Sequence, residues 1–145
     1  MHDAVQILLV EDNPSDVKLT LHALRKHRLA NDVHVLRDGQ EALDYLFGEG
    51  DYAGRSVAAT PCLILLDLKL PKVDGLEVLK RIKVDERTKR IPVTMLTSSR
   101  ESNDVQRAFD LGVNSYIVKR VDFEQFTESV RQIGFYWLLL NESQR

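Results

Sequence analysis

The sequence predicts an α/β fold, in which a doubly wound, five-stranded parallel sheet is covered by helices on both faces. Five short apolar runs alternate along the chain with segments whose apolar residues recur at helical spacing. Such alternation is typical of a parallel sheet, because each helix carries the chain back across one face of it. The 145 residues suit one domain of ordinary size, and neither an internal repeat nor a linker divides them. We therefore expect residues 1–145 to form a single domain.

The composition argues against several classes of protein. Hydrophobic residues make up 43% and charged residues 29% of the chain, as in a soluble globular protein. The formal net charge of −2 argues against a sequence-independent nucleic-acid binder, and no apolar run is long enough to span a membrane. Cys62, the only cysteine, stands beside four aliphatic residues and is interpreted as a core residue rather than a redox group. We expect a cytoplasmic protein.

The first two strands are expected at residues 7–10 and 33–36. Asn13 can cap the helix between them, with Pro14 at its first helical position. The second strand carries more polar residues than the first, which places it near an edge of the sheet. A helix follows from about residue 39 to residue 47.

The middle of the chain begins with a long loop, residues 48–61, which we expect to be irregular. Residues 63–66 form an unbroken apolar run, as expected of a central strand that is covered on both faces. Asp74 is a candidate cap for the helix that follows, and residues 92–96 form the fourth strand.

The remaining segments complete the alternation of helices and strands. Gly112 ends a helix that is marked by Val105, Ala108 and Phe109, and residues 116–118 form the fifth strand. Asp122, with Gln125 three residues later, resembles a capping box and opens the last helix.

Polar side chains interrupt the chain at the ends of four of the five strands. Glu11 and Asp12 follow the first strand, Asp67 follows the third, Thr97 the fourth and Lys119 the fifth. In a doubly wound sheet, ligands bind just beyond the carboxyl ends of the strands. Because all of these side chains lie at that edge, we expect them to line one pocket.

The residue types in this pocket suit a magnesium site that assists phosphoryl transfer. Neighbouring carboxylates repel one another unless a cation intervenes, and an all-oxygen site with room for water suits Mg²⁺. The histidines show no metal-ligand spacing, which makes zinc and iron poor candidates. Lys119 would supply a fixed positive charge, and Thr97 a hydroxyl donor, to an incoming phosphoryl group. Asp67 is the candidate nucleophile because it ends the most apolar strand; the alternative for Asp67 alone is a residue that begins a turn.

Four motifs point to a known family. They are Val10-Glu11-Asp12-Asn13, Leu65-Leu66-Asp67-Leu68 followed by Pro71 and Asp74-Gly75, Leu96-Thr97-Ser98, and Tyr116-Ile117-Val118-Lys119. Over essentially its whole length the chain resembles the receiver domain of two-component response regulators. The resemblance implies a flavodoxin-like sheet with strand order 2-1-3-4-5. It also implies a signalling module that assists only its own phosphorylation and slow dephosphorylation, and is not otherwise an enzyme.

The same resemblance implies how the phosphoryl group is accepted. A partner histidine kinase or a small phosphodonor would phosphorylate Asp67. Mg²⁺ would be held by Asp12, Asp67 and the backbone carbonyl of Lys69, with Glu11 assisting through water.

The resemblance further implies a switch. Thr97 would swing its hydroxyl to the phosphoryl oxygens, Lys119 would pair with them, and Tyr116 would move between outward and inward rotamers. The alternative for Tyr116 is a half-buried strand aromatic. One departure concerns Arg120, because the family usually has proline after a cis peptide at this position. A cis bond before any other residue costs about 3–4 kcal/mol, so a trans bond is expected.

A narrower resemblance connects the chain with the stand-alone regulators that work with phytochrome-type kinases. It is carried by Asn13-Pro14-Ser15-Asp16, Phe47-Gly48-Glu49-Gly50 and Leu70-Pro71-Lys72 followed by Asp74-Gly75. It implies a phytochrome-type sensor kinase as partner, and we expect no DNA-binding output domain. The protein would then act through protein contacts, through phosphate relay or as a phosphate sink.

The end of the chain predicts a homodimer. The run Phe135, Tyr136, Trp137, Leu138 and Leu139 is apolar on every side, more than one buried helix face can absorb. The alternative is that this run folds back over its own core.

Two rival functions use the same site. A Mg²⁺-dependent aspartyl-phosphate phosphatase typically needs a second acid two residues after its nucleophile, where this chain has Lys69. A degenerate receiver that acts only as a docking module would not need the complete set of acidic, hydroxyl and lysine side chains.

Overall fold

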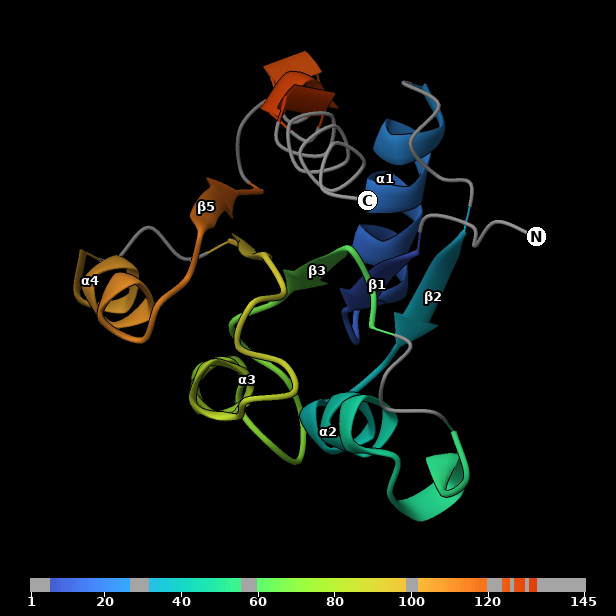
Figure 1. The fold of residues 1–145 in the computed structure, drawn as a ribbon. Coiled ribbons are helices and arrows are strands. Elements are labelled where there is room, and N and C mark those ends of the chain that lie inside the picture. Colours follow the sequence, from blue (N-terminus) through green and yellow to red (C-terminus); the bar gives the residue numbers. More distant parts are fainter. Residues whose placement is uncertain are drawn as a thin grey trace.

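The sheet has the predicted number, direction and order of strands. The computed structural model describes residues 6–26, 32–55, 60–98, 102–119, 124–125, 127–129 and 131–132 (Figure 1). All neighbouring strands are parallel, and their order is β2-β1-β3-β4-β5. The strands are β1 (Ile7–Val10), β2 (Val33–Leu36), β3 (Leu63–Leu66), β4 (Val93–Thr97) and β5 (Ser115–Val118).

Helices cover both faces of this sheet. They are α1 (Pro14–Lys26), α2 (Gly39–Phe47), α3 (Gly75–Val84), α4 (Ser102–Asp110) and the short 3₁₀ turn η1 (Gly50–Tyr52). Side chains of α2, α3 and α4 share one buried cluster, whereas those of α1 share the other. Leu8 and Val10 of β1 belong to the first cluster and Ile7 and Leu9 to the second, because successive strand residues point to opposite faces. The sheet is therefore buried on both sides, as the apolar runs predict.

Most of the predicted helix ends are confirmed. The Asn13 side-chain oxygen accepts hydrogen bonds from the backbone N–H groups of Ser15 (2.9 Å) and Asp16 (3.2 Å), which caps α1. Gly112 has a positive φ of 98°, the left-handed conformation that commonly ends a helix. Asp74 stands at the cap position of α3, but among the described residues its side chain makes no capping hydrogen bond.

The loop after α2 is more ordered than the sequence suggests. Residues 48–55 form a left-handed turn at Gly48 and then η1. The rings of His34 and Tyr45 stack at 4.8 Å, and the Tyr52 ring meets Tyr45 edge-on at 5.1 Å. The Arg55 guanidinium lies 3.9 Å above the Tyr45 ring. These ring contacts with α2 and β2 fix a segment that local sequence alone leaves irregular.

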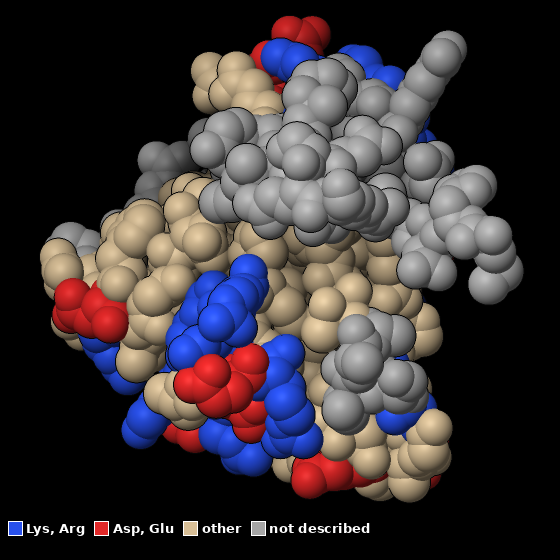
Figure 2. All heavy atoms as spheres, viewed as in Figure 1, with Lys and Arg blue, Asp and Glu red and all other residues tan. Residues whose placement is uncertain are grey.

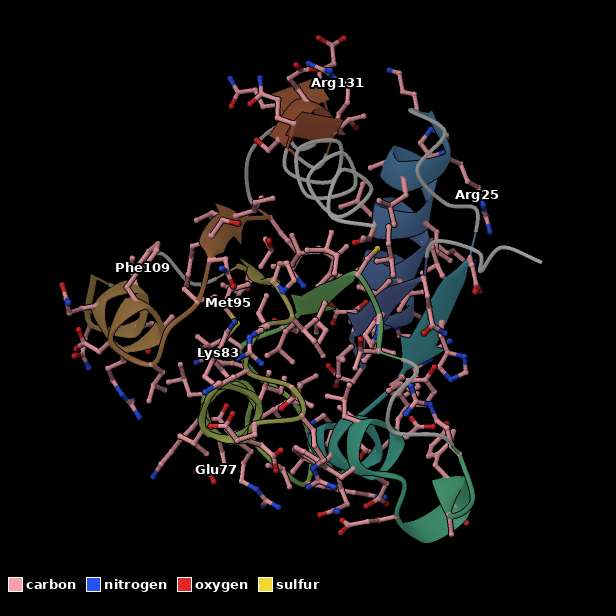
Figure 3. All side chains as sticks on the ribbon, in the orientation of Figure 1. Arg25, Glu77, Lys83, Met95, Phe109 and Arg131 are labelled. Carbon is pink, nitrogen blue, oxygen red and sulfur yellow. The ribbon has the colours of Figure 1, made fainter. Side chains whose placement is uncertain are left out.

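Most apolar side chains of the described residues are buried, and Val84 and Phe109 are exceptions. Cys62 is 7% exposed and lies in the core, as predicted, with its thiol donating to the Gln6 carbonyl at 3.1 Å. Met95 is fully buried, and Phe109 on α4 is 48% exposed (Figure 3). Over α3, Lys and Arg side chains are interleaved with Asp and Glu (Figure 2). Close ion pairs such as Arg87–Asp85 (2.9 Å) and Lys89–Glu86 (2.8 Å) balance charge locally in the chain that follows α3.

Three predictions concern residues outside the described parts of the chain. They are the start of the last helix at Asp122, the geometry of the Lys119–Arg120 peptide, and the dimer surface Phe135–Leu139. Among the helices that are described, none is long and apolar enough to cross a membrane.

Candidate functional site

The predicted site residues follow the strands at one edge of the sheet. Val10 of β1 is paired in register with Leu66 of β3, so the residues that come next, Glu11 and Asp67, stand side by side. Thr97 is the last residue of β4 and is paired in register with Val118, the last residue of β5. Lys119 therefore lies one residue beyond the end of β5. The sheet therefore brings together residues that are far apart in the sequence.

Backbone hydrogen bonds continue past the strand ends and fix these residues. The Asp67 N–H donates to the Val10 carbonyl (3.0 Å), and the Glu11 N–H donates to the Leu36 carbonyl (2.9 Å). The Lys119 N–H donates to the Thr97 carbonyl (2.7 Å). The sheet thus fixes the backbone positions of Glu11, Asp67 and Lys119.

Three carboxylates form a group that could hold a divalent metal ion. One oxygen from each of Glu11, Asp12 and Asp67 lies within 4.8 Å of the others. Glu11 is 1% and Asp67 8% exposed, whereas Asp12 is exposed, so the group opens to solvent on one side. Carboxylate oxygens with room for water are the ligands that Mg²⁺ prefers, and the residues present fit that ion.

Lys119 places its ammonium among three carboxylates. Its Nζ lies 2.6 Å from Glu11 Oε1, 2.8 Å from Asp16 Oδ2 and 3.7 Å from Asp67 Oδ2. The Lys119 side chain is only 6% exposed. Asp12, which lies beside Glu11 and Asp67, brings the site to four carboxylates for one ammonium, an excess of three negative charges when all are ionised. A divalent cation would relieve this excess.

Burial and the neighbouring charged groups shift the pKa values of Glu11 and Lys119. Burial raises the pKa of Glu11 from its usual 4.5 to about 7, and the neighbouring Asp67 charge adds to this, although the hydrogen bond from Lys119 acts against it. Burial lowers the pKa of Lys119, but its hydrogen bonds to Asp16 and Glu11 outweigh that effect and leave the value above normal. The ammonium thus stays charged, and Glu11 carries a proton for part of the time near neutral pH.

The backbone beneath Asp67 packs against the first residue of α3. A Cβ atom on Gly75 would lie 2.2 Å from the Asp67 carbonyl oxygen and 2.6 Å from that of Leu68. The Gly75 N–H donates to the Leu68 carbonyl at 2.9 Å. Only glycine permits this approach, so Gly75 supports the position of Asp67. This role is not evident from the sequence alone, although Gly75 belongs to the family motif.

Thr97, Tyr116 and Lys69 are three further residues that the sequence predicts to take part in the site. Thr97 is 2% exposed at the end of β4. Tyr116, on β5, is half-buried and packs against the core cluster of α2, α3 and α4. Lys69 is exposed in the loop two residues after Asp67. The roles assigned to these side chains, and to the Lys69 carbonyl, remain predictions.

Asp16 belongs to the candidate site, although the sequence suggests no role for it beyond its place in the motif Asn13-Pro14-Ser15-Asp16. It lies in the first turn of α1, where the Asn13 cap fixes the start of the helix. The sequence does place Asp16 three residues after Asn13, at the start of a helix that follows Glu11 and Asp12 closely. This position could have indicated that Asp16 lies near the site.

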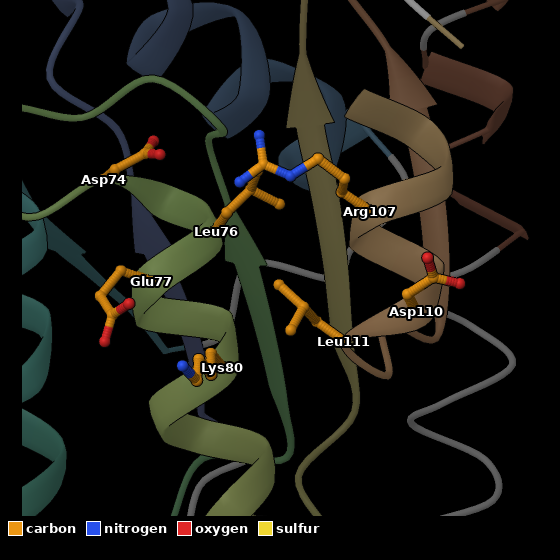
Figure 4. Close-up of a pocket in the computed structure, with 7 residues that line it drawn as sticks. All are labelled: Asp74, Leu76, Glu77, Lys80, Arg107, Asp110 and Leu111. Carbon is orange, nitrogen blue, oxygen red and sulfur yellow. The ribbon is translucent and has the colours of Figure 1, made fainter. Parts of the chain in front are cut away.

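A groove lies between α3 and α4. Its volume is about 360 Å³, and charged side chains line it on both helices, Glu77 and Lys80 on α3 and Arg107 and Asp110 on α4. In Figure 4 the Arg107 guanidinium extends from α4 toward Leu76 on α3. None of the strand-end residues lines this groove.

Residues 7–131 match the model of the response regulator receiver domain, and the chain belongs to this family. Receiver domains are generally signalling modules rather than enzymes, and they act with histidine kinases. Phosphorylation on an aspartate and dependence on Mg²⁺ are general properties of the family.

Similar proteins narrow the relationship to the phytochrome response regulators. The response regulator Rcp1 of Synechocystis is 40% identical over 132 residues, which are 91% of this chain and 88% of Rcp1. The fold is similar to the crystal structure of the phosphorylated cyanobacterial phytochrome response regulator RcpA, with a TM-score of 0.83. The two sequences are 45% identical, and the match covers 94% of this chain and 95% of RcpA. A Mn²⁺-bound structure of Rcp1 has a TM-score of 0.82 at 39% identity, covering 93% and 95% of the two chains.

The chain is also similar to a protein that is named for the regulation of methanogenesis. The probable methanogenesis regulatory protein FilR2 of Methanothrix harundinacea is 46% identical over 142 residues, which are 97% of this chain and 88% of FilR2. Identity at this level therefore does not by itself specify a pathway.

Proposed function

We propose that this protein is a response regulator that accepts a phosphoryl group on Asp67 from a sensor histidine kinase, in a Mg²⁺-dependent phosphorelay. The observation that supports this most directly is the surroundings of Asp67. Its carboxylate shares a group of three acidic side chains with Glu11 and Asp12, and it lies 3.7 Å from the Lys119 ammonium. This arrangement combines a nucleophile, a metal-binding group and a fixed positive charge.

The chemistry follows from these positions. A carboxylate oxygen of Asp67 would form a bond to phosphorus as the bond between phosphorus and the donor's histidine nitrogen breaks. Mg²⁺, when bound by Asp12, Asp67 and the Lys69 carbonyl with help from Glu11, would supply positive charge to the phosphoryl oxygens. Lys119 would pair with one of these oxygens, and the Thr97 hydroxyl would donate to another.

The response would be read through Tyr116. Phosphorylation adds about −1.5 to −2 of charge, enough to bias a segment that has two arrangements. Tyr116 is half-buried on β5, next to the strand that Thr97 closes, so rotation of its ring can follow movement of Thr97. We propose that this rotation reports phosphorylation at the surface formed by α4, β5 and the last helix.

A phytochrome-type kinase is the proposed partner. RcpA is described as a phytochrome response regulator, and Rcp1 as a response regulator. FilR2 shows that a similar chain can belong to another system, so a set of candidate kinases should be compared by phosphotransfer to this protein. A cytoplasmic location and a homodimer formed through Phe135–Leu139 complete the proposal.

The proposal is tested by incubating the protein with acetyl phosphate and Mg²⁺ and measuring the mass of the intact chain. The wild type should gain one phosphoryl group, lose it slowly, and fail to gain it when Asp67 is changed to Asn. Release of many equivalents of phosphate per chain would instead favour the phosphatase. Absence of labelling would favour a docking module, and labelling that persists in Asp67→Asn would assign the nucleophile elsewhere.

A further inference from the structure

Lys119 is held by a carboxylate that does not belong to the metal-binding group. Asp16 Oδ2 and Glu11 Oε1 accept hydrogen bonds from its Nζ at 2.8 Å and 2.6 Å. Asp67 Oδ2 lies 3.7 Å from the same nitrogen, too far for a hydrogen bond. An ammonium has three N–H donors, and two of them are used by Glu11 and Asp16 among the described residues. The third can donate to an oxygen of a group bound at Asp67.

We propose that Asp16 is a positioning residue that holds the Lys119 ammonium off the Asp67 carboxylate while the protein is unphosphorylated. The inference rests on the proposed function, because it concerns how Asp67 is kept open to a metal ion and a phosphodonor. Asp16 itself is not expected to touch either of them.

The burial of Lys119 explains why its position depends on Asp16. The side chain is 6% exposed, so the ammonium must pair with a carboxylate inside the site rather than turn to water. Without Asp16, only Glu11 and Asp67 remain among its described partners. A shift of about 1 Å would then bring Lys119 into hydrogen-bond distance of Asp67. The ammonium would occupy the oxygen that the metal ion and the phosphodonor need.

Asp16 is suited to this role by its place on α1. Its backbone N–H is tied to the Asn13 cap at 3.2 Å, so the helix rather than a metal ion fixes it. It is absent from the group formed by Glu11, Asp12 and Asp67, and a cation that engages this group can therefore leave the Asp16–Lys119 pair in place.

The test is the affinity for Mn²⁺, measured from the electron paramagnetic resonance signal of the free ion. Four proteins are compared: wild type, Asp16→Ala, Lys119→Met and the double variant. Asp16→Ala should weaken Mn²⁺ binding about 10-fold when Lys119 is present, and no more than about 2-fold in the Lys119→Met background. Equal losses in both backgrounds would mean that Asp16 acts only through its charge, and no loss in either would mean that it does not act at all. Both results overturn the proposal.

Three controls sharpen this result. Asp16→Glu keeps a carboxylate that can reach Lys119 and should restore most of the affinity, whereas Asp16→Asn keeps only a neutral acceptor and should fall between wild type and Asp16→Ala. Asp51→Ala removes an exposed carboxylate in η1 and should leave the affinity within about 2-fold of wild type. A loss of affinity in Asp16→Glu as large as in Asp16→Ala would contradict the assigned role.

Labelling of the same proteins separates this inference from the proposed function. If the wild type is phosphorylated at Asp67 but Asp16 and Lys119 show no coupling in Mn²⁺ binding, only the role of Asp16 is refuted. If the wild type is not phosphorylated, the proposed function fails whatever the metal measurements show. Asp16→Ala should also slow labelling by acetyl phosphate about as strongly as it weakens Mn²⁺ binding.

Discussion

The raised pKa of Glu11 predicts an unusual dependence of stability on pH. The folded protein keeps a proton on Glu11 up to about pH 7, whereas the unfolded chain releases it near the usual value of 4.5. Between these values the folded state binds more protons than the unfolded state. The stability of the folded state therefore decreases as the pH rises through this window. A carboxyl group whose pKa is lowered by folding has the opposite effect.

The size of the effect follows from the two pKa values. Each pKa unit of difference corresponds to about 1.4 kcal/mol, so a gap between 4.5 and about 7 corresponds to about 3 kcal/mol in the free energy of unfolding. The contribution is fully present below pH 4.5 and lost above about pH 7. Because Glu11 is 1% exposed, solvent screens this effect little.

The measurement is urea denaturation of the wild type and of Glu11→Gln from about pH 5 to about pH 8. Gln keeps an oxygen acceptor for Lys119 but cannot titrate, so the difference between the two proteins isolates Glu11 from the other ionisable groups. We expect the wild type to lose about 2–3 kcal/mol relative to Glu11→Gln across this range. Mg²⁺ should restore the stability of the wild type most at the high end, where the carboxylates are ionised. A difference that stays constant with pH would refute the reasoning.

Three other predictions concern packing, capping and assembly. Gly75→Ala places a Cβ 2.2 Å from the Asp67 carbonyl oxygen and should destabilise the fold by about 3 kcal/mol in urea denaturation. Gly54→Ala, where nothing lies within 4 Å but φ is 94°, should cost only about 1 kcal/mol, and equal losses would contradict the role of crowding. Asn13→Ala removes the cap of α1 and should lower stability by about 1 kcal/mol in thermal unfolding; an unchanged midpoint would count against the cap. Sedimentation at micromolar concentration should show a dimer for the wild type and a monomer for Trp137→Glu, whereas a wild type that is already monomeric would exclude the dimer.

The sequence predicts the sheet and the convergence of the acidic and lysine side chains well, for a physical reason. In a parallel sheet the carboxyl ends of the strands meet at one edge whatever the connections do, so Glu11, Asp67 and Lys119 can be placed from the strand pattern alone. The first turn of α1 is harder to place, because the side of the helix that faces Lys119 depends on a rotation that the apolar spacing does not define closely. The pairing of Asp16 with Lys119 is consequently found only in the structure.

Other features depend on contacts between distant parts of the chain. The need for glycine at position 75 arises where the backbone of α3 meets the backbone after β3, and no local signal reports that distance. The order of residues 48–55 depends on ring contacts of Tyr52 and Arg55 with Tyr45, which precedes them on α2, and of Tyr52 with His34 on β2. Propensity within the segment itself therefore predicts an irregular loop.

The backbone hydrogen bonds that run past the strand ends couple the folding of the sheet to that of the site. Asp67 is tied to Val10 and Lys119 to Thr97 by main-chain atoms, so these residues lose their backbone freedom when the sheet forms. An incoming ligand then has only side-chain rotations to order, and the entropy opposing its binding is correspondingly small. The main chain at Asp67 and Lys119 is thus pre-organised before any partner arrives.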